Sequence, residues 1–138
     1  MKAIIQDRKA MKLAGNRVAR GIKRASLYIE GEVKDSLAIG QEIEWRTSKK
    51  GTRYPVGKDP SKPPDPPHTL TGRLKQSITN VVQIGHRSIS GYVGTNVKYA
   101  RRLELGYHAK GISQEPRPYL RKAIWENTAK IVKLIAKG

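Results

Sequence analysis

The chain has 138 residues, which suits one domain, and its core must be modest because only 37% of the residues are apolar and Phe is absent. Its 28 Lys and Arg outnumber its 11 Asp and Glu, and the formal net charge of +17 favours a polyanion or an acidic protein surface as partner. Cysteine is absent, which excludes disulfides and thiolate metal sites, and the apolar runs fall far short of the ~20 residues that cross a bilayer.

The N-terminal stretch "MKAIIQDRKAMKLAG" lacks the layout of a signal peptide, so we expect a soluble intracellular protein without a membrane partner. Residues 3–39 are predicted to form a long helix, because apolar residues recur every three or four positions. Glycines within it weaken this pattern and indicate either close packing or a kink. The other faces are strongly basic, and our first candidate partner-binding residues lie there: Arg17, Arg20, Lys23 and Arg24.

Residues 42–46 alternate and predict a short strand, and residues 47–68 then hold six of the eight prolines. That density of proline excludes a helix or a central strand, so we expect an extended Pro/Lys-rich arm. A segment of this length is either a flexible linker or an arm that becomes ordered on a partner. Its candidate partner-binding residues are Lys49, Lys50 and Arg53.

A short helix and a hairpin are predicted next. Thr69 or Thr71 can cap a helix whose apolar face carries Leu74 and Ile78. The segments "TNVVQI" and "SISGYVGT" then have the composition of two strands, and "GHRS" between them predicts a hairpin connection.

Two further helices are predicted near the C-terminal end of the sequence. Asn96 can cap the first, which buries Tyr99, Ala100 and Leu103, and Gly106 is placed as its left-handed stop. A polar loop follows as far as Pro116.

Pro118 fits the first turn of the last helix, whose apolar face carries Leu120, Ile124, Ile131 and Ile135, with Trp125 alongside. The remaining candidate partner-binding residues lie in and after the helix that Gly106 ends: Arg101, Arg102 and Arg117.

No catalytic, cofactor or metal pattern is recognisable in the sequence. The three histidines lie in separate predicted loops, and neither a nucleophile motif nor a phosphate-binding glycine pattern occurs. Glu104 is interpreted as one half of a weak, exposed ion pair along its helix. We therefore expect a protein that is not an enzyme and that needs no cofactor.

The basic charge has two interpretations. One is direct binding to the phosphates of DNA, as a small basic DNA-binding protein. The other is docking to acidic protein surfaces in a larger assembly. Aromatic residues do not interleave with the basic ones as in a base-stacking platform, which weighs against the first interpretation.

Several short motifs occur in a characteristic order between Thr71 and Leu120. A Thr-Gly-x-Leu segment is followed by Val-Gly-x-x-x-x-Tyr-Ala, then by Glu-x-Gly, and then by a Pro-Tyr-Leu start to the last helix. In this order and spacing the chain resembles the tail-completion and head–tail joining family of long-tailed phages and prophages. The matching positions are Thr71, Gly72, Leu74, Val93, Gly94, Tyr99, Ala100, Glu104, Gly106, Pro118, Tyr119 and Leu120.

The resemblance implies a single α+β domain over residues 1–138: a long N-terminal helix, a small antiparallel sheet with a hairpin, and short helices and a C-terminal helix packed on it. It implies a structural virion protein that joins tail to head at the neck, after assembly in the host cytoplasm. The implied partners are other copies of the chain in a six-fold ring, the tail terminator or tail tube, and head-side neck proteins, with DNA nearby in the channel.

Overall fold

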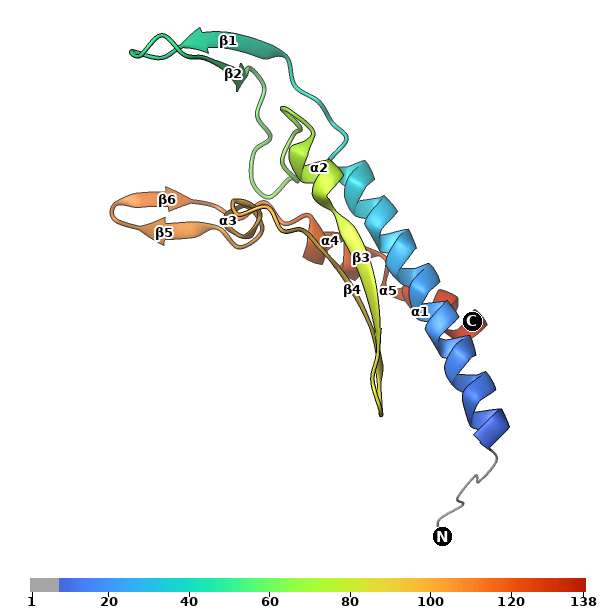
Figure 1. Ribbon diagram of the computed structural model, residues 1–138. Coiled ribbons are helices and arrows are strands. Elements are labelled where there is room, and N and C mark those ends of the chain that lie inside the picture. The colour runs from blue at the N-terminus through green and yellow to red at the C-terminus, as the bar shows by residue number, and fades with distance from the viewer. Residues whose placement is uncertain (1–7) are drawn as a thin grey trace.

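The structure is a computed structural model that describes residues 8–138, with side chains described from residue 14. It has the expected α+β fold, built around one long helix (Figure 1). The elements run in the order α1 (Arg8–Ser36), β1 (Ile43–Thr47), β2 (Arg53–Gly57), α2 (Arg73–Ser77), β3 (Thr79–Ile84), β4 (Ile89–Gly94), α3 (Ala100–Leu105), β5 (Tyr107–Ala109), β6 (Ile112–Gln114), α4 (Leu120–Glu126) and α5 (Thr128–Lys137).

Helix α1 is the element against which the others pack. Its buried residues Ala25, Ile29, Val33 and Leu37 follow one another at steps of four, as the apolar stripe predicts. This stripe contacts the β3–β4 hairpin, α2, α4 and α5. The predicted range of 3–39 extended too far at its C-terminal end, and residues 3–7 lie outside the described part of the chain.

The packing around Gly21 explains why one of the helix glycines is needed. It is buried where α1 meets α5, and a Cβ there would collide with the backbone of Ile135. Of the two readings that the sequence left open, close packing is therefore the correct one at Gly21. Gly15 and Gly31 have open space around them, so no neighbouring atom requires glycine there.

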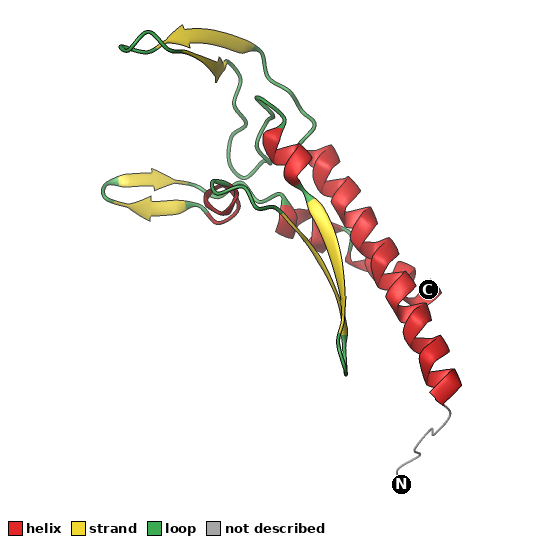
Figure 2. Ribbon diagram, in the orientation of Figure 1, coloured by secondary structure: helices red, strands yellow, loops and turns green. Residues whose placement is uncertain are grey.

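The expected antiparallel strands form three separate two-stranded hairpins (Figure 2). The β3–β4 hairpin is confirmed, including its "GHRS" connection, and Val82 pairs with Gly91 in its register. Gly91 lies close to α1, because a Cβ there would meet Ile22 and Ser26. The β1–β2 and β5–β6 hairpins both project to one side of α1 (Figure 1).

Residues 47–68 contain no helix and no central strand, as predicted, but they do contain an edge strand, β2, which we did not expect. Pro55 lies inside β2, opposite Trp45. A two-stranded sheet has only edge strands, and a proline is tolerated wherever its missing N–H would face solvent. The β1 prediction of 42–46 is confirmed with a shift of one residue.

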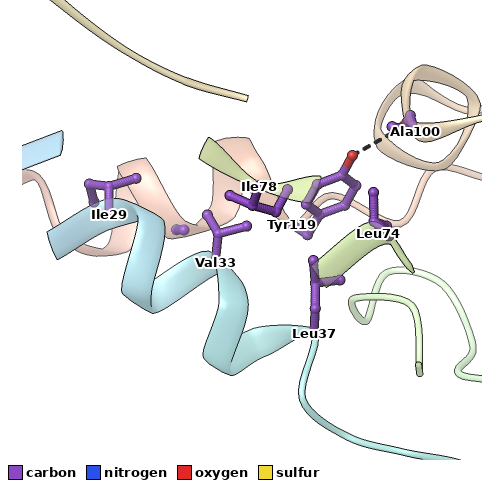
Figure 3. Packing of buried hydrophobic residues seen from close by; sticks show 8 residues of the cluster. Ile29, Val33, Leu37, Leu74, Ile78, Ala100 and Tyr119 are labelled. Atoms are coloured by element: carbon purple, nitrogen blue, oxygen red, sulfur yellow. Dashed lines mark hydrogen bonds between the residues drawn. The ribbon is translucent and has the colours of Figure 1, made fainter. Parts of the chain in front are cut away.

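The core collects residues from α1, α2, α3 and α4. Tyr119, Leu37, Ile78 and Val33 are its largest fully buried side chains. Figure 3 shows the Tyr119 ring lying between Leu74 and Ile78, with its hydroxyl directed at the Ala100 carbonyl at 3.4 Å. The motif residues near Tyr119 therefore belong to the core of the domain.

Two predicted helix caps are wrong. Helix α2 begins after Gly72, whose φ is 75°, and the Thr71 hydroxyl only accepts the Arg73 N–H at 3.4 Å. Helix α3 begins after Tyr99 and not after Asn96. The Thr95 hydroxyl accepts the Val97 N–H at 3.1 Å, so a turn occupies the residues where the cap was expected.

The last helix differs from the prediction in two ways. Pro118 precedes it, because α4 begins at Leu120 after Tyr119, and the helix breaks at Asn127 into α4 and α5. The Asn127 amide donates to Ala123 and accepts from the Tyr28 hydroxyl, each at 2.8 Å, which fixes the break against α1. Trp125 is 69% exposed and does not join the apolar face.

Candidate functional site

Glu104 organises the turn that joins α3 to α4. Its carboxylate accepts the backbone N–H groups of Tyr119 at 2.8 Å and of Leu120 and Arg121 at 3.0 Å. The first N–H groups of a helix have no partner within the helix, and the helix dipole favours negative charge there. Glu104 is therefore the cap of α4, supplied from a distant element.

Arg121 completes this arrangement. Its Nε donates to the Glu104 carboxylate at 3.0 Å, and its Nη2 donates to the Glu104 carbonyl oxygen at 2.7 Å. Burial alone would raise the pKa of Glu104, but the N–H groups of Tyr119, Arg121 and Leu120 and the Arg121 guanidinium outweigh it and lower the pKa below its ordinary value. The carboxylate is therefore ionised at neutral pH, and these donors fix its position.

The expected exposed ion pair at Glu104 is wrong, since the residue is only 7% exposed. Local helix spacing could not identify partners that lie 15 to 17 residues away. One signal was available: Glu104 is the only acidic residue between Asp65 and Glu115, in an otherwise basic stretch. A single carboxylate in such a stretch is a candidate for a specific structural contact.

Gly106 turns the chain from α3 into the β5–β6 hairpin. Its positive φ of 77° is confirmed, but its ψ of 177° lies outside the left-handed helical region that we predicted. The observed combination of a positive φ with an extended ψ is essentially restricted to glycine. The expected polar loop is the β5–β6 hairpin itself, and the Arg117 N–H closes its base by donating to the Leu103 carbonyl at 2.6 Å.

The four candidate basic residues of α1 do not form one free surface. Arg24 donates to the Gly138 carbonyl at 2.8 Å and Arg17 donates to the Ala136 carbonyl at 3.4 Å, so both lie at the C-terminal end of α5. Lys23 donates to the Asn80 side chain of β3 at 2.8 Å. Arg20 is exposed, and its side chain forms no hydrogen bond with the residues that the structure describes.

The candidate residues of the arm lie at the far end of the β1–β2 hairpin. Lys49 and Lys50 occupy its turn and are exposed. The Arg53 guanidinium lies 5.5 Å from the centre of the Trp45 ring, close enough for a cation–π interaction. These three residues form a basic tip on a projecting element.

The remaining candidates separate into exposed and inward residues. Arg101 is exposed on α3, and the Arg102 guanidinium lies 4.3 Å from the Tyr107 ring. Arg117 is half-buried and directs its guanidinium toward the Ser61 hydroxyl at 3.5 Å. Arg117 thus joins the segment after β2 to the α3–α4 turn.

Large apolar side chains are exposed on the same projecting elements. In the β1–β2 hairpin, Ile43, Trp45 and Tyr54 are 41%, 57% and 42% exposed. Ile112 of the β5–β6 hairpin is 65% exposed. A two-stranded hairpin with both faces in solvent is only marginally stable, so the arm has the composition of a binding element.

The described residues also limit the chemistry that we can assign. No group of three or more potential ligand side chains is arranged there to hold a metal ion. Ser113 and His108 form one hydroxyl–imidazole contact at 2.8 Å, but they are exposed cross-strand neighbours in the β5–β6 hairpin. Among the described helices, none is sufficiently long and apolar to cross a membrane.

Comparison of the chain with protein-family models, with curated proteins and with solved structures finds no match in any of the three.

Proposed function

We propose that the chain is a structural virion protein at the head–tail interface of a long-tailed phage, where it serves as a tail-completion or neck component that joins tail to head. The observation that carries the proposal is the convergence, in space, of the motif residues on which the resemblance depends. These residues are separated by up to about 50 positions in the sequence, and most of them meet around Tyr119.

The convergence involves each motif in turn. Leu74, Ala100 and Tyr119 belong to one buried cluster, and Val93 packs against it. Glu104 caps the helix that Tyr119 and Leu120 begin. A family motif conserves its spacing when its residues build one structural unit, and this arrangement provides a physical reason for the order Thr71 to Leu120.

The proposed role is structural and not catalytic. We propose other copies of the chain in a six-fold ring as one class of partner, and the tail terminator or tail tube and head-side neck proteins as the other. The protein would wait in the host cytoplasm during assembly and then lie at the neck of the virion. Its charge of +17 suits late addition to an acidic site, near the DNA channel.

Direct DNA binding is the second candidate function, and the basic tip of the arm favours it. Binding to phosphates would weaken steeply with salt. Titration of labelled duplex DNA with the purified chain, at low and at physiological salt, distinguishes the two. Tight binding that persists at physiological salt would favour the DNA-binding candidate.

A gene knockout in the phage or prophage tests the main proposal. We expect DNA-filled heads and separate tails, few infectious particles, and partial recovery of infectivity when the purified protein is added to the lysate. Intact infectious virions would contradict the proposal. Normal tails with empty heads would move the protein to an earlier step on the head side.

A further inference from the structure

We propose that residues 42–58 form an intersubunit arm whose apolar face binds a groove on α1 of a second copy of the chain. The groove, called here the isoleucine groove, has a volume of about 310 Å³ and lies between α1, β4, α4 and α5. Its apolar lining includes Ile22, Ile29, Ile89, Ile124, Ile131 and Ile135. The inference extends the ring of the proposed function by naming the contact that would build it.

The arm carries a surface that suits this groove. Ile43, Trp45 and Pro55 lie on one face, since Trp45 pairs with Pro55 and side chains alternate along a strand. Arg53 lies on the same face, and its guanidinium must move off the Trp45 ring before the ring can enter the groove. The hairpin is closed at its base by a backbone hydrogen bond from Lys58 to Glu42 at 2.9 Å. It therefore presents an aromatic anchor on a structured ribbon, and buried tryptophans commonly contribute most of the binding energy of an interface.

The arm does not fill the groove of its own copy. In Figure 1 the arm leaves from the C-terminal end of α1 and extends away from it, whereas α5 lies beside the middle and N-terminal parts of α1. The groove uses Ile22, at the midpoint of α1, and Ile29, one turn from the core residue Val33. The two surfaces thus lie at different places on the subunit, with the groove beside the middle of α1 and the arm beyond its C-terminal end, and a repeated head-to-tail contact of this kind builds a ring when its rotation closes.

The exposed area of the chain supports a second copy as the occupant. The accessible surface is 10610 Å², against about 7,200 Å² expected for a compact monomer of this mass. The excess of about 3,400 Å² is more than the ~1,600 Å² that two interfaces of ~800 Å² per subunit would cover, which is the number of interfaces that each member of a ring contributes.

Charge sets the condition under which the contact forms. The arm has a net positive charge, with five basic and two acidic residues in 42–58, and α1 is also basic. Like charges oppose association at low salt, and the screening length falls from ~10 Å at 0.1 M to ~3 Å at 1 M. Self-association should therefore strengthen with salt, whereas binding of a basic face to an acidic partner or to DNA should weaken.

Trp45 emission provides the first test. In the Trp125→Phe variant Trp45 is the only tryptophan, and we expect its emission to shift to the blue as protein concentration rises at about 1 M salt. Light scattering on the same samples should show association, with an affinity reduced about tenfold or more by Trp45→Ser or Ile124→Gln. Both positions are exposed, so neither change removes a core side chain. Ile112→Ser and Val132→Gln, at exposed positions outside the arm and the groove, are matched controls.

A mixing experiment establishes that the two surfaces belong to different copies. The Trp45→Ser chain keeps its groove and the Ile124→Gln chain keeps its arm, so an equimolar mixture should form dimers at a concentration at which each variant alone is monomeric. A wild type that stays monomeric, together with unshifted Trp45 emission in the Trp125→Phe variant, at high salt and high concentration would overturn the inference. It would also be overturned if the mixture formed no dimer, or if both variants associated like the wild type. Because the purified chain is used, these outcomes leave the head–tail role to be decided by the knockout.

Discussion

The Glu104 carboxylate accepts the backbone N–H of Tyr119 at 2.8 Å, and this contact joins the end of α3 to the start of α4. It places the most buried aromatic ring of the core one residue before the helix that Glu104 caps. Three backbone donors and one guanidinium share a single carboxylate, so the cap and the core depend on the same side chain.

Glu104→Gln should lower the free energy of unfolding by about 3 kcal/mol, because a buried, charge-assisted cap is replaced by an amide whose NH2 group faces donors. Chemical denaturation measures the change, and Glu115→Gln, at an exposed position, should stay within about 0.5 kcal/mol of the wild type.

The direction in which the stabilisation by Glu104 changes with pH follows from the lowered pKa of its carboxyl group. The stabilisation is complete above the ordinary carboxyl pKa of 4.5 and is lost as the pH falls through the folded-state value, so the wild type should converge on the variant in acid.

Gly106→Ala should destabilise by about 2 kcal/mol or more. The backbone conformation at φ 77° disfavours a Cβ, and that Cβ would lie 2.8 Å from the Gln114 carbonyl oxygen. Gly111 is the control for positive φ, because its φ is 76° but a Cβ there would meet open space. Gly111→Ala should therefore cost only about 1 kcal/mol by the same denaturation measurement. Equal losses at both positions would show that the contact with Gln114 contributes nothing.

Tyr119→Phe should cost less than about 1 kcal/mol, whereas Tyr119→Ala should cost about 3–5 kcal/mol. The hydroxyl makes one long hydrogen bond of 3.4 Å to Ala100, but the ring is only 1% exposed. Thermal or chemical unfolding of both variants measures the difference. A loss in Tyr119→Phe as large as that in Tyr119→Ala would mean that the hydroxyl, and not the ring, holds this part of the core.

Limited trypsin digestion should cut the described part of the chain first at Lys49 or Lys50. Both lie in the exposed turn of a two-stranded hairpin, which opens easily. Arg73 and Lys75 flank the buried Leu74 in α2 and should be cut later. Mass spectrometry of early fragments identifies the order, and Lys49→Gln/Lys50→Gln should delay the first cut. Early cleavage in α2, with the arm intact, would show that the arm is packed.

Arg17→Gln/Arg24→Gln should lower stability by about 0.5–1 kcal/mol, because both cations lie against the carbonyl groups at the C-terminal end of α5. The control is Arg20→Gln/Arg87→Gln, which removes the same charge from two exposed positions. Denaturation at low and at high salt compares the pairs, and the difference should shrink with salt. No difference between the pairs at low salt would exclude Arg17 and Arg24 from holding α5.

Periodic and local patterns predicted the parts of the fold that depend on one segment. The step of four from Ala25 to Leu37 predicted α1, and the turn residues between Ile84 and Ile89 predicted the β3–β4 hairpin. Gly106 was assigned a positive φ because the apolar pattern ends there, and only its ψ was misjudged.

The features that were missed depend on partners distant in sequence. The cap of α4 comes from Glu104, and the break between α4 and α5 is fixed at Asn127 by Tyr28, 99 positions away. Likewise, Arg17 and Arg24 had the spacing of a solvated basic face, and only the position of α5 shows that they contact its C-terminal end. Helical periodicity reports which face is apolar but not what lies against the polar one.

The closure of the arm at Glu42 and Lys58 makes its reach adjustable. The two residues are joined by a backbone hydrogen bond and by an ion pair, each of 2.9 Å, so the chain enters and leaves the ribbon at one place. Two residues added to each strand lengthen a hairpin by roughly 7 Å and keep every side chain on its original face. One residue added to each strand would turn Trp45 to the opposite face. Insertions in even steps can therefore fit the arm to neighbours at different spacings while α1 and the Tyr119 core stay unchanged.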